Sequence, residues 1–395
     1  MQHTTNRRRF LAASAALGAA GAAPAAPAAR GYHSDIYAKV GVRPLINGVG
    51  TVTVLGGSIM PPEVVGAMEE ASRHFVPMLE LQEKVGARIA ELIGVPAAMV
   101  TCGAASAIQV AAAACVARGN PEFLRRLPDT SGMKNEIVQQ KSHRSGYEAQ
   151  MLQCGTKIVW VETRQELDRA INDRTAMMFF LNKADPDGRI KRAEWIRVGK
   201  ERGVPTFNDA AADVPPVGNL SLYVKEGFDL VTFSGGKGLF GPQASGILMG
   251  SEELVAAGRK AISPHGGIGR GMKVGKEEMM GLLAAVERYV RLDHAAERRV
   301  LDGRAAHVLK ALEKVKSVQA ELHIPEIANH VPHVNVTWDA GRAGFTPQDI
   351  VGRLRDGDPP IAVSQMKDGI RVSMWTLQDE EHKIVASRLQ QVLKA

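Results

Sequence analysis

The sequence predicts a mostly parallel α/β protein with a smaller α+β domain at the C-terminal end of its 395 residues. Between residues 98 and 233, short apolar segments alternate with helical patterns, as in chains whose parallel strands are joined by helices. After Val318 the pattern changes to strands of alternating polarity beside helices. Because a single core stops growing at about 250–300 residues, the length also favours a large and a small domain.

We expect four segments along the chain. The first, residues 1–30, is a signal segment, and the second, residues 31–60, is a turn-rich N-terminal arm. The third, residues 61–290, is the large domain, and the fourth, residues 291–395, is the small C-terminal domain.

Local patterns predict the individual elements. Strands of the large domain are expected at 98–101, 136–138, 157–161, 176–181, 205–208, 229–233 and 244–249. Helices are expected over 61–92 with a break near Pro77, then up to Arg118, and over 163–172, 192–202 and 276–312. In the small domain we expect strands at 333–338 and 370–374, and helices at 347–354 and 379–393.

The first thirty residues have the features of an export signal. Arg7-Arg8-Arg9 precedes Phe10-Leu11 and an alanine-rich apolar stretch, and Ala26-Pro27-Ala28 offers small residues for cleavage. This resembles a twin-arginine signal, so we expect the folded protein to be carried by the twin-arginine translocase to the periplasm. Neither this stretch nor a later segment predicts a stable membrane anchor. The alternative is a disordered alanine-rich leader on a cytoplasmic protein.

Charge and cysteine content exclude several classes of function. The formal charge of +7 falls to +4 if the leader and its three arginines are removed, and no basic block remains. We therefore expect no nucleic-acid partner. Cys102, Cys115 and Cys154 lack metal-type spacing, so no metal site is expected. A protein that folds in a reducing cytoplasm before export should keep them as free thiols.

The strongest chemical signal is a lysine in a glycine-rich turn. An apolar segment over 229–233 leads into Ser234-Gly235-Gly236-Lys237-Gly238. Glycines let such a turn lie against a flat ring. A desolvated lysine amine near cationic groups loses its charge and becomes a nucleophile and base. An isolated loop lysine would be unremarkable, but this context makes Lys237 the candidate catalytic residue.

A carboxylate ends the preceding expected strand. Asp209 follows Pro205–Asn208 and lies one strand–helix–strand step before Lys237. In a parallel sheet both residues would reach the carboxyl edge, where ligands bind. An aspartate there can pair with a protonated pyridine nitrogen. Considered alone, an aspartate that ends a strand is more often a turn or cap residue, and the shared register with Lys237 is what favours a site role for Asp209.

A third segment is suited to a phosphate. The loop Cys102-Gly103-Ala104-Ala105-Ser106 opens a helix, so backbone N–H groups point out of its N-terminus. The hydroxyl of Ser106, and that of Thr101 before it, could add donors. A helix start alone is a weak signal, because every helix needs a cap.

Together these segments resemble the SelA-like family of pyridoxal-5′-phosphate (PLP) enzymes, which contains selenocysteine synthase and an ammonia-lyase branch, the latter closer. The resemblance covers about residues 42–289. The residues that carry it are Leu45–Thr51, His74–Val76, Asp209–Ala212, Ser234–Lys237, Gly241–Gln243 and Gly267–Glu277.

The resemblance implies fold type I, the aspartate-aminotransferase-like fold of PLP-dependent transferases, with a seven-stranded sheet. It implies that Lys237 holds PLP as a Schiff base and that Asp209 serves the pyridine nitrogen. Ser106, Ser234 and the backbone of Ala104 and Ala105 would lie near the phosphate. The active sites of such enzymes lie between subunits, so a homodimer or higher homo-oligomer is expected.

Further residues are implied less directly. His143 is either the residue that stacks on the cofactor ring or an ordinary loop histidine. Asn182, with Lys183, is a candidate for the phenolic oxygen of PLP or for the substrate. Arg270 is expected to bind an anionic group. Where the relatives carry a late arginine this chain has Trp375, so Arg371 becomes the candidate anchor for the substrate carboxylate after a register shift.

The resemblance favours a lyase that performs α,β-elimination on a hydroxylated 2-amino acid or amino-sugar acid, giving a 2-oxo acid and ammonia. Export of the protein would favour an unphosphorylated substrate. Racemisation and aldol cleavage need the same residues and stay open. Selenium transfer onto an aminoacyl-tRNA is disfavoured by the modest charge and by the short stretch between the expected cleavage site and Val42. A non-catalytic PLP-binding role is disfavoured by Lys237 and Asp209.

Overall fold

The computed structural model describes residues 34–394 of the chain. The chain divides into a segment up to Leu45 and a compact unit over Ile46–Ala395. Within the first segment, the described part forms the short helix α1 (Asp35–Ala38). The predicted signal segment over 1–30 lies outside the described residues.

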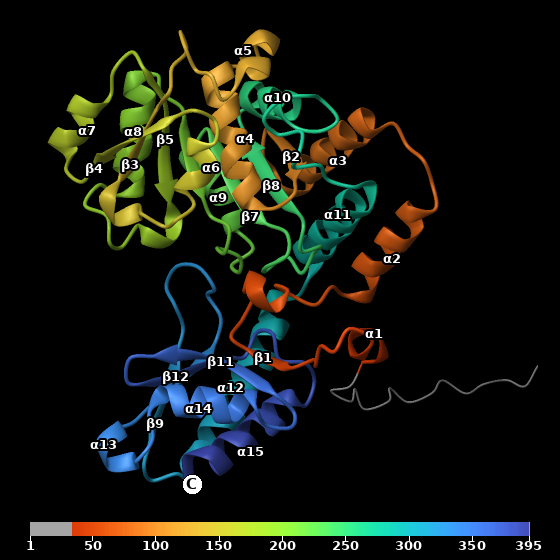
Figure 1. Cartoon of the computed structure of the whole chain (residues 1–395), viewed down its shortest axis with the longest axis vertical. Helices are drawn as coiled ribbons and strands as arrows, with labels where there is room; N and C mark the ends of the chain where they lie inside the picture. The colour runs from red at the N-terminus through yellow and green to blue at the C-terminus, as the bar shows by residue number, and fades with distance from the viewer. Residues whose placement is uncertain (1–33, 395) are drawn as a thin grey trace, which may run out of the picture. The chain divides into compact units, whose positions relative to one another are not determined.

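The larger of two sheets in the compact unit has seven strands in the order β2-β8-β7-β6-β5-β3-β4 (Figure 1). They are β2 (Ala97–Thr101), β3 (Glu136–Gln140), β4 (Lys157–Val161), β5 (Thr175–Leu181), β6 (Thr206–Asp209), β7 (Leu230–Ser234) and β8 (Gly246–Gly250). The pairs β4–β3, β3–β5, β5–β6 and β6–β7 are parallel. Only β8 runs against its neighbours β2 and β7, so the prediction of a mostly parallel sheet is confirmed.

Alternate residues of the strands enter two separate hydrophobic cores. In β5, Met178 and Phe180 belong to one core and Met177 and Phe179 to the other, and all four side chains are fully buried. Successive side chains of a strand point to opposite faces, so a sheet buried on both faces needs apolar residues throughout. This explains why the central strands have nearly continuous apolar sequences.

Helices cover both faces of this sheet. Residues from one group pack in the core of Phe180: α3 (Met78–Ile93), α7 (Arg164–Ala170), α8 (Arg192–Arg202), α9 (Asn219–Glu226) and α11 (Lys276–Arg291). The second group packs in the core of Phe179: α4 (Ala104–Ala117), α5 (Pro121–Arg126), α6 (Glu148–Leu152) and α10 (Glu252–Ala261). Helix α2 (Pro62–Ser72) packs on α11.

Helix α4 occupies the centre of its face. It contacts five strands, and Figure 1 shows it lying across them. Every residue from Ser106 to Ala117 is buried, and half of them are alanine. Small side chains let a helix lie close to a sheet, so the alanine-rich sequence fixes where the N-terminus of α4 meets the sheet edge.

The smaller sheet has five strands in the order β1-β11-β12-β10-β9. They are β1 (Ile46–Gly48), β9 (Gln319–His323), β10 (His333–Thr337), β11 (Ile361–Met366) and β12 (Gly369–Ser373). Its helices are α12 (His294–Leu312), α13 (Ala340–Ala343), α14 (Pro347–Arg355) and α15 (Glu381–Lys394). The predicted α+β character of this part is confirmed.

The structure differs from the expected elements in several ways. The elements that were not expected include strands β9 and β11 and helices α5, α6, α9, α10 and α13. Strand β1 lies within the expected turn-rich arm and pairs in parallel with β11, so residues far apart in the sequence share one sheet. The helix expected over 276–312 is two helices, because the chain breaks at Leu292 and the Asp293 side chain accepts the N–H of Ala296 to start α12. A three-residue strand and a mid-segment cap are weak signals beside the long apolar periodicity.

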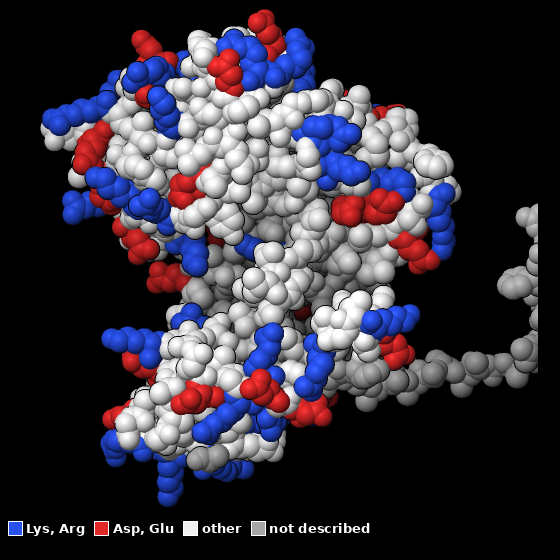
Figure 2. Space-filling model, viewed as in Figure 1, with Lys and Arg blue, Asp and Glu red and all other residues white. Residues whose placement is uncertain are grey.

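Charges of both signs are interspersed on the face of the molecule in Figure 2, and no extended area of one sign appears there. Among residues 34–394, no helix has the length and apolar character needed to cross a membrane. The three cysteines are free thiols, as predicted. Within the same residues, no cluster of His, Cys, Asp and Glu could hold a metal ion.

Candidate active site

The candidate residues lie along one edge of the seven-stranded sheet. Asp209 ends β6, and Ser234 ends the parallel neighbour β7 just before Lys237. Strand β2 runs in the same direction as β7, because both are antiparallel to β8. Thr101 at the end of β2 and Ser234 therefore flank the same residue, Gly246. The sheet thus brings the predicted lysine, carboxylate and phosphate loop to one edge.

Lys237 sits in a turn that is packed tightly on several sides. A Cβ at Gly236 would come within 2.7 Å of Gln243 Cα, and one at Gly238 would overlap the carbonyl of Val214. The same Gly238 position is 3.1 Å from the ring of Trp375. The glycines are therefore required by close approach, and they hold the lysine backbone in one place.

Burial lowers the pKa of Lys237, while the carboxylates of Asp209 and Asp213 oppose this effect and the charge of Lys183 adds to it. A lysine whose ammonium is desolvated is neutral more often at neutral pH. The amine can therefore act as a nucleophile and as a base, as the sequence predicted from the context of the turn.

Asp209 is a buried carboxylate that accepts a hydrogen bond from a backbone N–H group. Its side chain is 5% exposed, and its Oδ1 accepts the N–H of Ala211 at 3.1 Å. Burial raises the pKa of Asp209, against the hydrogen bond from Ala211 and the charge of Lys237. A buried carboxylate is stabilised by a cation beside it, and a protonated pyridine nitrogen is such a cation.

The loop before α4 is built to receive an anion. Gly103, at φ +123°, turns the chain into the helix, so the N–H groups of Ala104, Ala105 and Ser106 form its free N-terminus. The Ser106 hydroxyl is buried without a hydrogen-bond partner. A Cβ at Gly246 would come within 2.9 Å of Ala104 N, so only glycine leaves this N–H open. An unpartnered buried hydroxyl at a helix N-terminus suits a phosphate.

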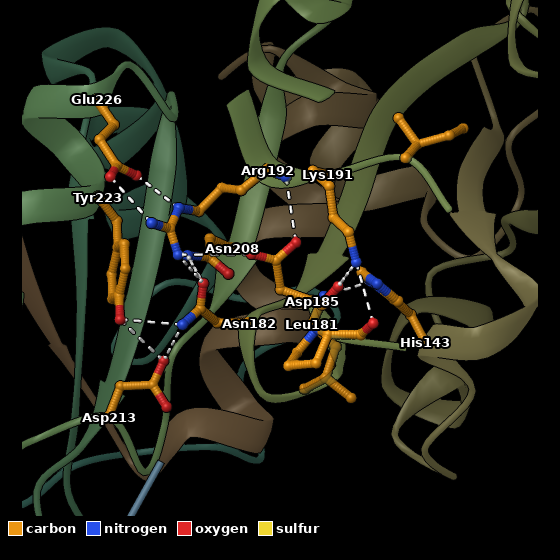
Figure 3. Close-up of polar contacts among 12 residues, drawn as sticks. His143, Leu181, Asn182, Asp185, Lys191, Arg192, Asn208, Asp213, Tyr223 and Glu226 are labelled. Atoms are coloured by element: carbon orange, nitrogen blue, oxygen red, sulfur yellow. Dashed lines mark hydrogen bonds and ion pairs between the residues drawn. The ribbon is translucent and has the colours of Figure 1, made fainter. Parts of the chain in front are cut away.

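A buried polar network follows Asp209 along the edge (Figure 3). The Asn182 amide donates to Asp213 Oδ2 at 2.6 Å and lies 2.9 Å from the Tyr223 hydroxyl, which itself donates to Asp213 at 3.3 Å. Behind them, Arg192 donates to Asn182 Oδ1 at 3.2 Å and pairs with Glu226. Of this network the sequence indicated Asn182 as a site residue, and Asp213 as the residue to test if Asp209 does not serve the ring nitrogen. Tyr223 and Arg192 left no signal in the sequence.

His143 follows β3 and is completely buried. Its ring lies edge-on to Phe180 at 4.4 Å, and its Nδ1 accepts the N–H of Leu181 at 3.1 Å. Burial lowers the pKa of His143 to about 4, so the imidazole is neutral at physiological pH. Its stacking on a cofactor stays a prediction, because its contacts are with the strand ends.

The predicted anion-binding arginines lie on other elements. Arg270 is exposed in the turn between α10 and α11, 3.5 Å from the Ser263 hydroxyl. Arg371 is on β12 and donates to Asn335 Oδ1 at 2.8 Å. Trp375, at the position where an arginine was expected, packs against Phe240 with ring centroids 6.0 Å apart. No hydrogen bond joins either arginine to Lys237 within the described residues, so both roles stay predictions.

The residues of this edge fit PLP. A helix N-terminus with an unpartnered hydroxyl suits its phosphate, a buried carboxylate suits its ring nitrogen, and a desolvated lysine suits its aldehyde. The three groups come from α4, β6 and the turn after β7.

The chain matches the family model of SelA, described as L-seryl-tRNA selenium transferase, over residues 151–350, which is just over half of its length. It is 32% identical over 379 residues to 5′-C-glycyluridine monooxygenase-decarboxylase from Streptomyces sp, covering 92% of this chain and 93% of that protein. The chain belongs to the SelA family.

Another SelA-family relative is D-glucosaminate-6-phosphate ammonia lyase from Salmonella typhimurium, 29% identical over 372 residues and covering 91% of this chain and 98% of that protein. A solved structure of D-glucosaminate-6-phosphate ammonia-lyase superposes with a TM-score of 0.78 at 28% identity, covering 91% of this chain and 98% of that one. Aspartate aminotransferase from Thermotoga maritima, at 18% identity and a TM-score of 0.52, covers 91% and 94% and shares the fold alone. The predicted fold type I is confirmed, and the matches support PLP as the cofactor.

We expect Ser106→Ala to weaken PLP binding. The substitution removes a buried hydroxyl whose hydrogen-bonding capacity would go to the phosphate, and such a charge-assisted bond is worth about 1.5–3 kcal/mol, or roughly 10- to 150-fold in affinity. The measurement is fluorescence titration of the PLP-free protein with PLP. Ser131→Ala, at an exposed serine in the loop before β3, should bind PLP like the wild type. Equal affinity for Ser106→Ala and the wild type would place the phosphate elsewhere.

Proposed function

We propose that this SelA-family protein is a PLP-dependent ammonia-lyase acting on a hydroxylated 2-amino acid or amino-sugar acid. The observation that carries the proposal is the similarity to D-glucosaminate-6-phosphate ammonia-lyase in both sequence and structure over 91% of this chain. The residues at the sheet edge supply what such a reaction needs.

Three sets of residues would hold the cofactor. The N-terminus of α4, with Ser106 and Ser234, binds the phosphate, Asp209 pairs with the ring nitrogen, and Lys237 forms the covalent link. When bound, PLP supplies an electron sink that makes the Cα–H of an attached amino acid acidic.

Lys237 is the residue placed to move the proton. After the substrate amine has displaced it, its neutral Nζ accepts the proton from Cα, and the resulting ammonium gives that proton to the leaving β-hydroxyl. The hydroxyl departs as water together with the C–O bonding electrons. The proton taken is the proton returned, so this step needs no other acid or base.

The final products balance with one water molecule. Lys237 takes back its position and releases an enamine, which tautomerises to an imine. Water adds to the imine carbon and ammonia leaves, giving a 2-oxo acid. The water lost in elimination is thus regained in hydrolysis, and the net reaction is loss of ammonia without an oxidant or reductant.

The substrate we propose is unphosphorylated, unlike the compound in the Salmonella relative's name. This part rests on the predicted twin-arginine signal, because phosphorylated sugar acids are mainly cytoplasmic compounds. The arginine of the polar network at the sheet edge, Arg192, is already paired with Glu226.

Purified protein loaded with PLP should release ammonia and a 2-oxo acid from at least one member of a panel of hydroxylated 2-amino acids and 2-amino-sugar acids, tested with and without a phosphate group. Lys237→Ala should lose turnover by at least about 10³-fold, since it lacks both the covalent link and the base. Borohydride reduction followed by peptide mass spectrometry should find PLP on Lys237. Reduction onto Lys183 or Lys273 instead would refute the assignment.

The same panel separates the other reactions. Racemisation would change optical rotation without ammonia, aldol cleavage would give an aldehyde, and selenium transfer would need a charged tRNA. The Streptomyces relative is named a monooxygenase-decarboxylase, so oxygen uptake and carbon dioxide release are recorded as well. Any of these results without ammonia would replace the lyase proposal.

We also propose that the protein is a homodimer or a higher homo-oligomer. Val54, Ile59 and Phe75 leave large apolar side chains exposed at 90%, 59% and 104%. Large exposed apolar side chains are typical of interfaces between chains. All three lie between residues 54 and 75, and Val54 and Ile59 belong to the segment whose Ser58 hydroxyl donates to the carbonyl of Gly236 in the Lys237 turn.

Phe75→Glu should therefore shift the protein toward the monomer, because a buried unpaired carboxylate disfavours association. The mass is measured by light scattering at several protein concentrations. Val300→Glu places the same charge at a half-exposed apolar position on α12 and serves as the control. A wild type that is monomeric at all concentrations would contradict the proposal.

Export is the remaining part of the proposal. Residues 1–31 fused to a reporter should send it to the periplasm only in cells with a working twin-arginine translocase, and Arg8→Ala should block transport. A reporter that stays in the cytoplasm with its leader attached would remove the argument for an unphosphorylated substrate, while leaving the lyase proposal standing.

A further inference from the structure

Asp213 is a buried carboxylate that the proposed reaction does not use. It is 2% exposed and lies in the loop after β6, four residues beyond Asp209. Its Oδ2 accepts from the Asn182 amide and the Tyr223 hydroxyl, and its backbone carbonyl accepts from Asn219. These partners are all neutral. The side chain is therefore held in place without its charge being cancelled.

The cations near Asp213 are few. Arg192 reaches Asn182 but forms two bonds to Glu226, so its charge is already balanced. The loop of Asp213 contacts the turn of Lys237, because a Cβ at Gly238 would overlap the carbonyl of Val214. Across this contact the charges of Asp213 and Lys237 act on each other's pKa. Tyr223 keeps its proton, because burial and the charge of Asp213 both raise its pKa. Lys237 is therefore the nearby cation whose charge Asp213 can balance.

We propose that Asp213 is the positioning residue that serves as the counterion of Lys237 while Asp209 is paired with the ring nitrogen of PLP. The inference rests on the proposed roles of Lys237 and Asp209. The charges of both carboxylates raise the pKa of the lysine. Once Asp209 neutralises the ring nitrogen, Asp213 is the remaining carboxylate that stabilises a positive charge on the Lys237 nitrogen.

This division of labour matters because Lys237 has to be neutral before it accepts a proton and stable as a cation afterwards. Burial and Lys183 favour the neutral amine. A fixed carboxylate with neutral partners favours the cation by Coulomb attraction, whichever amino acid is bound. Burial raises the pKa of Asp213 to about 6, and the charge of Asp209 raises it further, while the hydrogen bonds from Asn182 and Tyr223 lower it. The carboxylate of Asp213 is therefore ionised above about pH 6.

The test is a spectroscopic pH titration of the holoenzyme without substrate. The Lys237–PLP linkage is cationic when protonated, and its absorbance changes when the proton is lost. In Asp213→Asn the amide can still contact Asn182 and Tyr223, but the charge is gone. The titration midpoint should fall by about one pH unit or more. In the PLP-free protein, capture of added PLP near pH 7 should become about tenfold faster, because more of the Lys237 amine is neutral.

Two variants separate charge from structure. Asp213→Glu keeps the charge and should restore a midpoint closer to the wild type than that of Asp213→Asn. Asp187→Asn removes an exposed carboxylate from the loop that also carries Lys183, and should leave the midpoint within about 0.3 unit, since exposed charges are screened. If Asp213→Asn is insoluble, Tyr223→Phe takes its place, with a smaller shift in the same direction expected from a less stabilised carboxylate.

The outcomes are distinct from those of the proposed function. A wild type without a pH-dependent band attached to Lys237 would refute the assignment of Lys237, on which the inference depends. A normal wild-type band together with an unshifted midpoint in Asp213→Asn, at full PLP content, would overturn the role of Asp213 and leave the lyase proposal intact. Equal shifts in Asp213→Asn and Asp187→Asn would show a general charge effect and would also overturn it.

Discussion

Charges that have been removed from water at the edge of one sheet govern the arrangement of the rest of this protein. Lys237, Asp209 and Asp213 lie where the carboxyl ends of β6 and β7 meet. The free-energy cost of burying an isolated charge exceeds the net stability of a typical domain, so these groups must lie close together and be held in place. The close-packed glycine turn, the neutral donors to Asp213 and the helices on both faces of the sheet each serve that requirement. The proposed reaction depends on the same balance of charges. If the carboxylates stabilised the Lys237 ammonium too strongly, its amine would rarely be neutral and could not accept a proton.

The residues that stabilise the fold and the residues proposed to react lie in different parts of the structure. The two cores on the faces of the sheet, around Phe179 and Phe180, consist of apolar groups and define the positions of the strand ends. The polar groups of the site lie at these strand ends and in the loops and helices around them, where backbone N–H groups and side chains can converge on a ligand. The network from Glu226 through Arg192 to Asn182 extends this polar layer behind the site. In its ion pair the charge of Arg192 is balanced by Glu226.

The sequence predicted the sheet and the three main site residues because each leaves a local signal. Apolar runs separated by helical patterns gave the strand positions to within one to three residues, and the glycines around Lys237 marked a close approach. Strand β1 was missed because three residues carry no periodicity, and its partner β11 is more than three hundred positions away. Tyr223 and Arg192 were missed because their role arises only when helix α8 packs on β5 and β6 and helix α9 packs on β7. The contacts of His143 with Phe180 and Leu181 likewise depend on tertiary packing.

The packing of the Lys237 turn constrains how this fold can diversify. Gly236 and Gly238 are pressed against Gln243, Val214 and Trp375, so the part of the site that carries the lysine tolerates almost no change in shape. Trp375 belongs to the segment after β12, outside the seven-stranded sheet, and its ring lies against the same turn. Substitutions that change which molecule the site accepts are therefore expected outside this turn, for example in the smaller sheet and its loops. The lysine turn is a rigid unit, and selectivity can vary only in the parts around it.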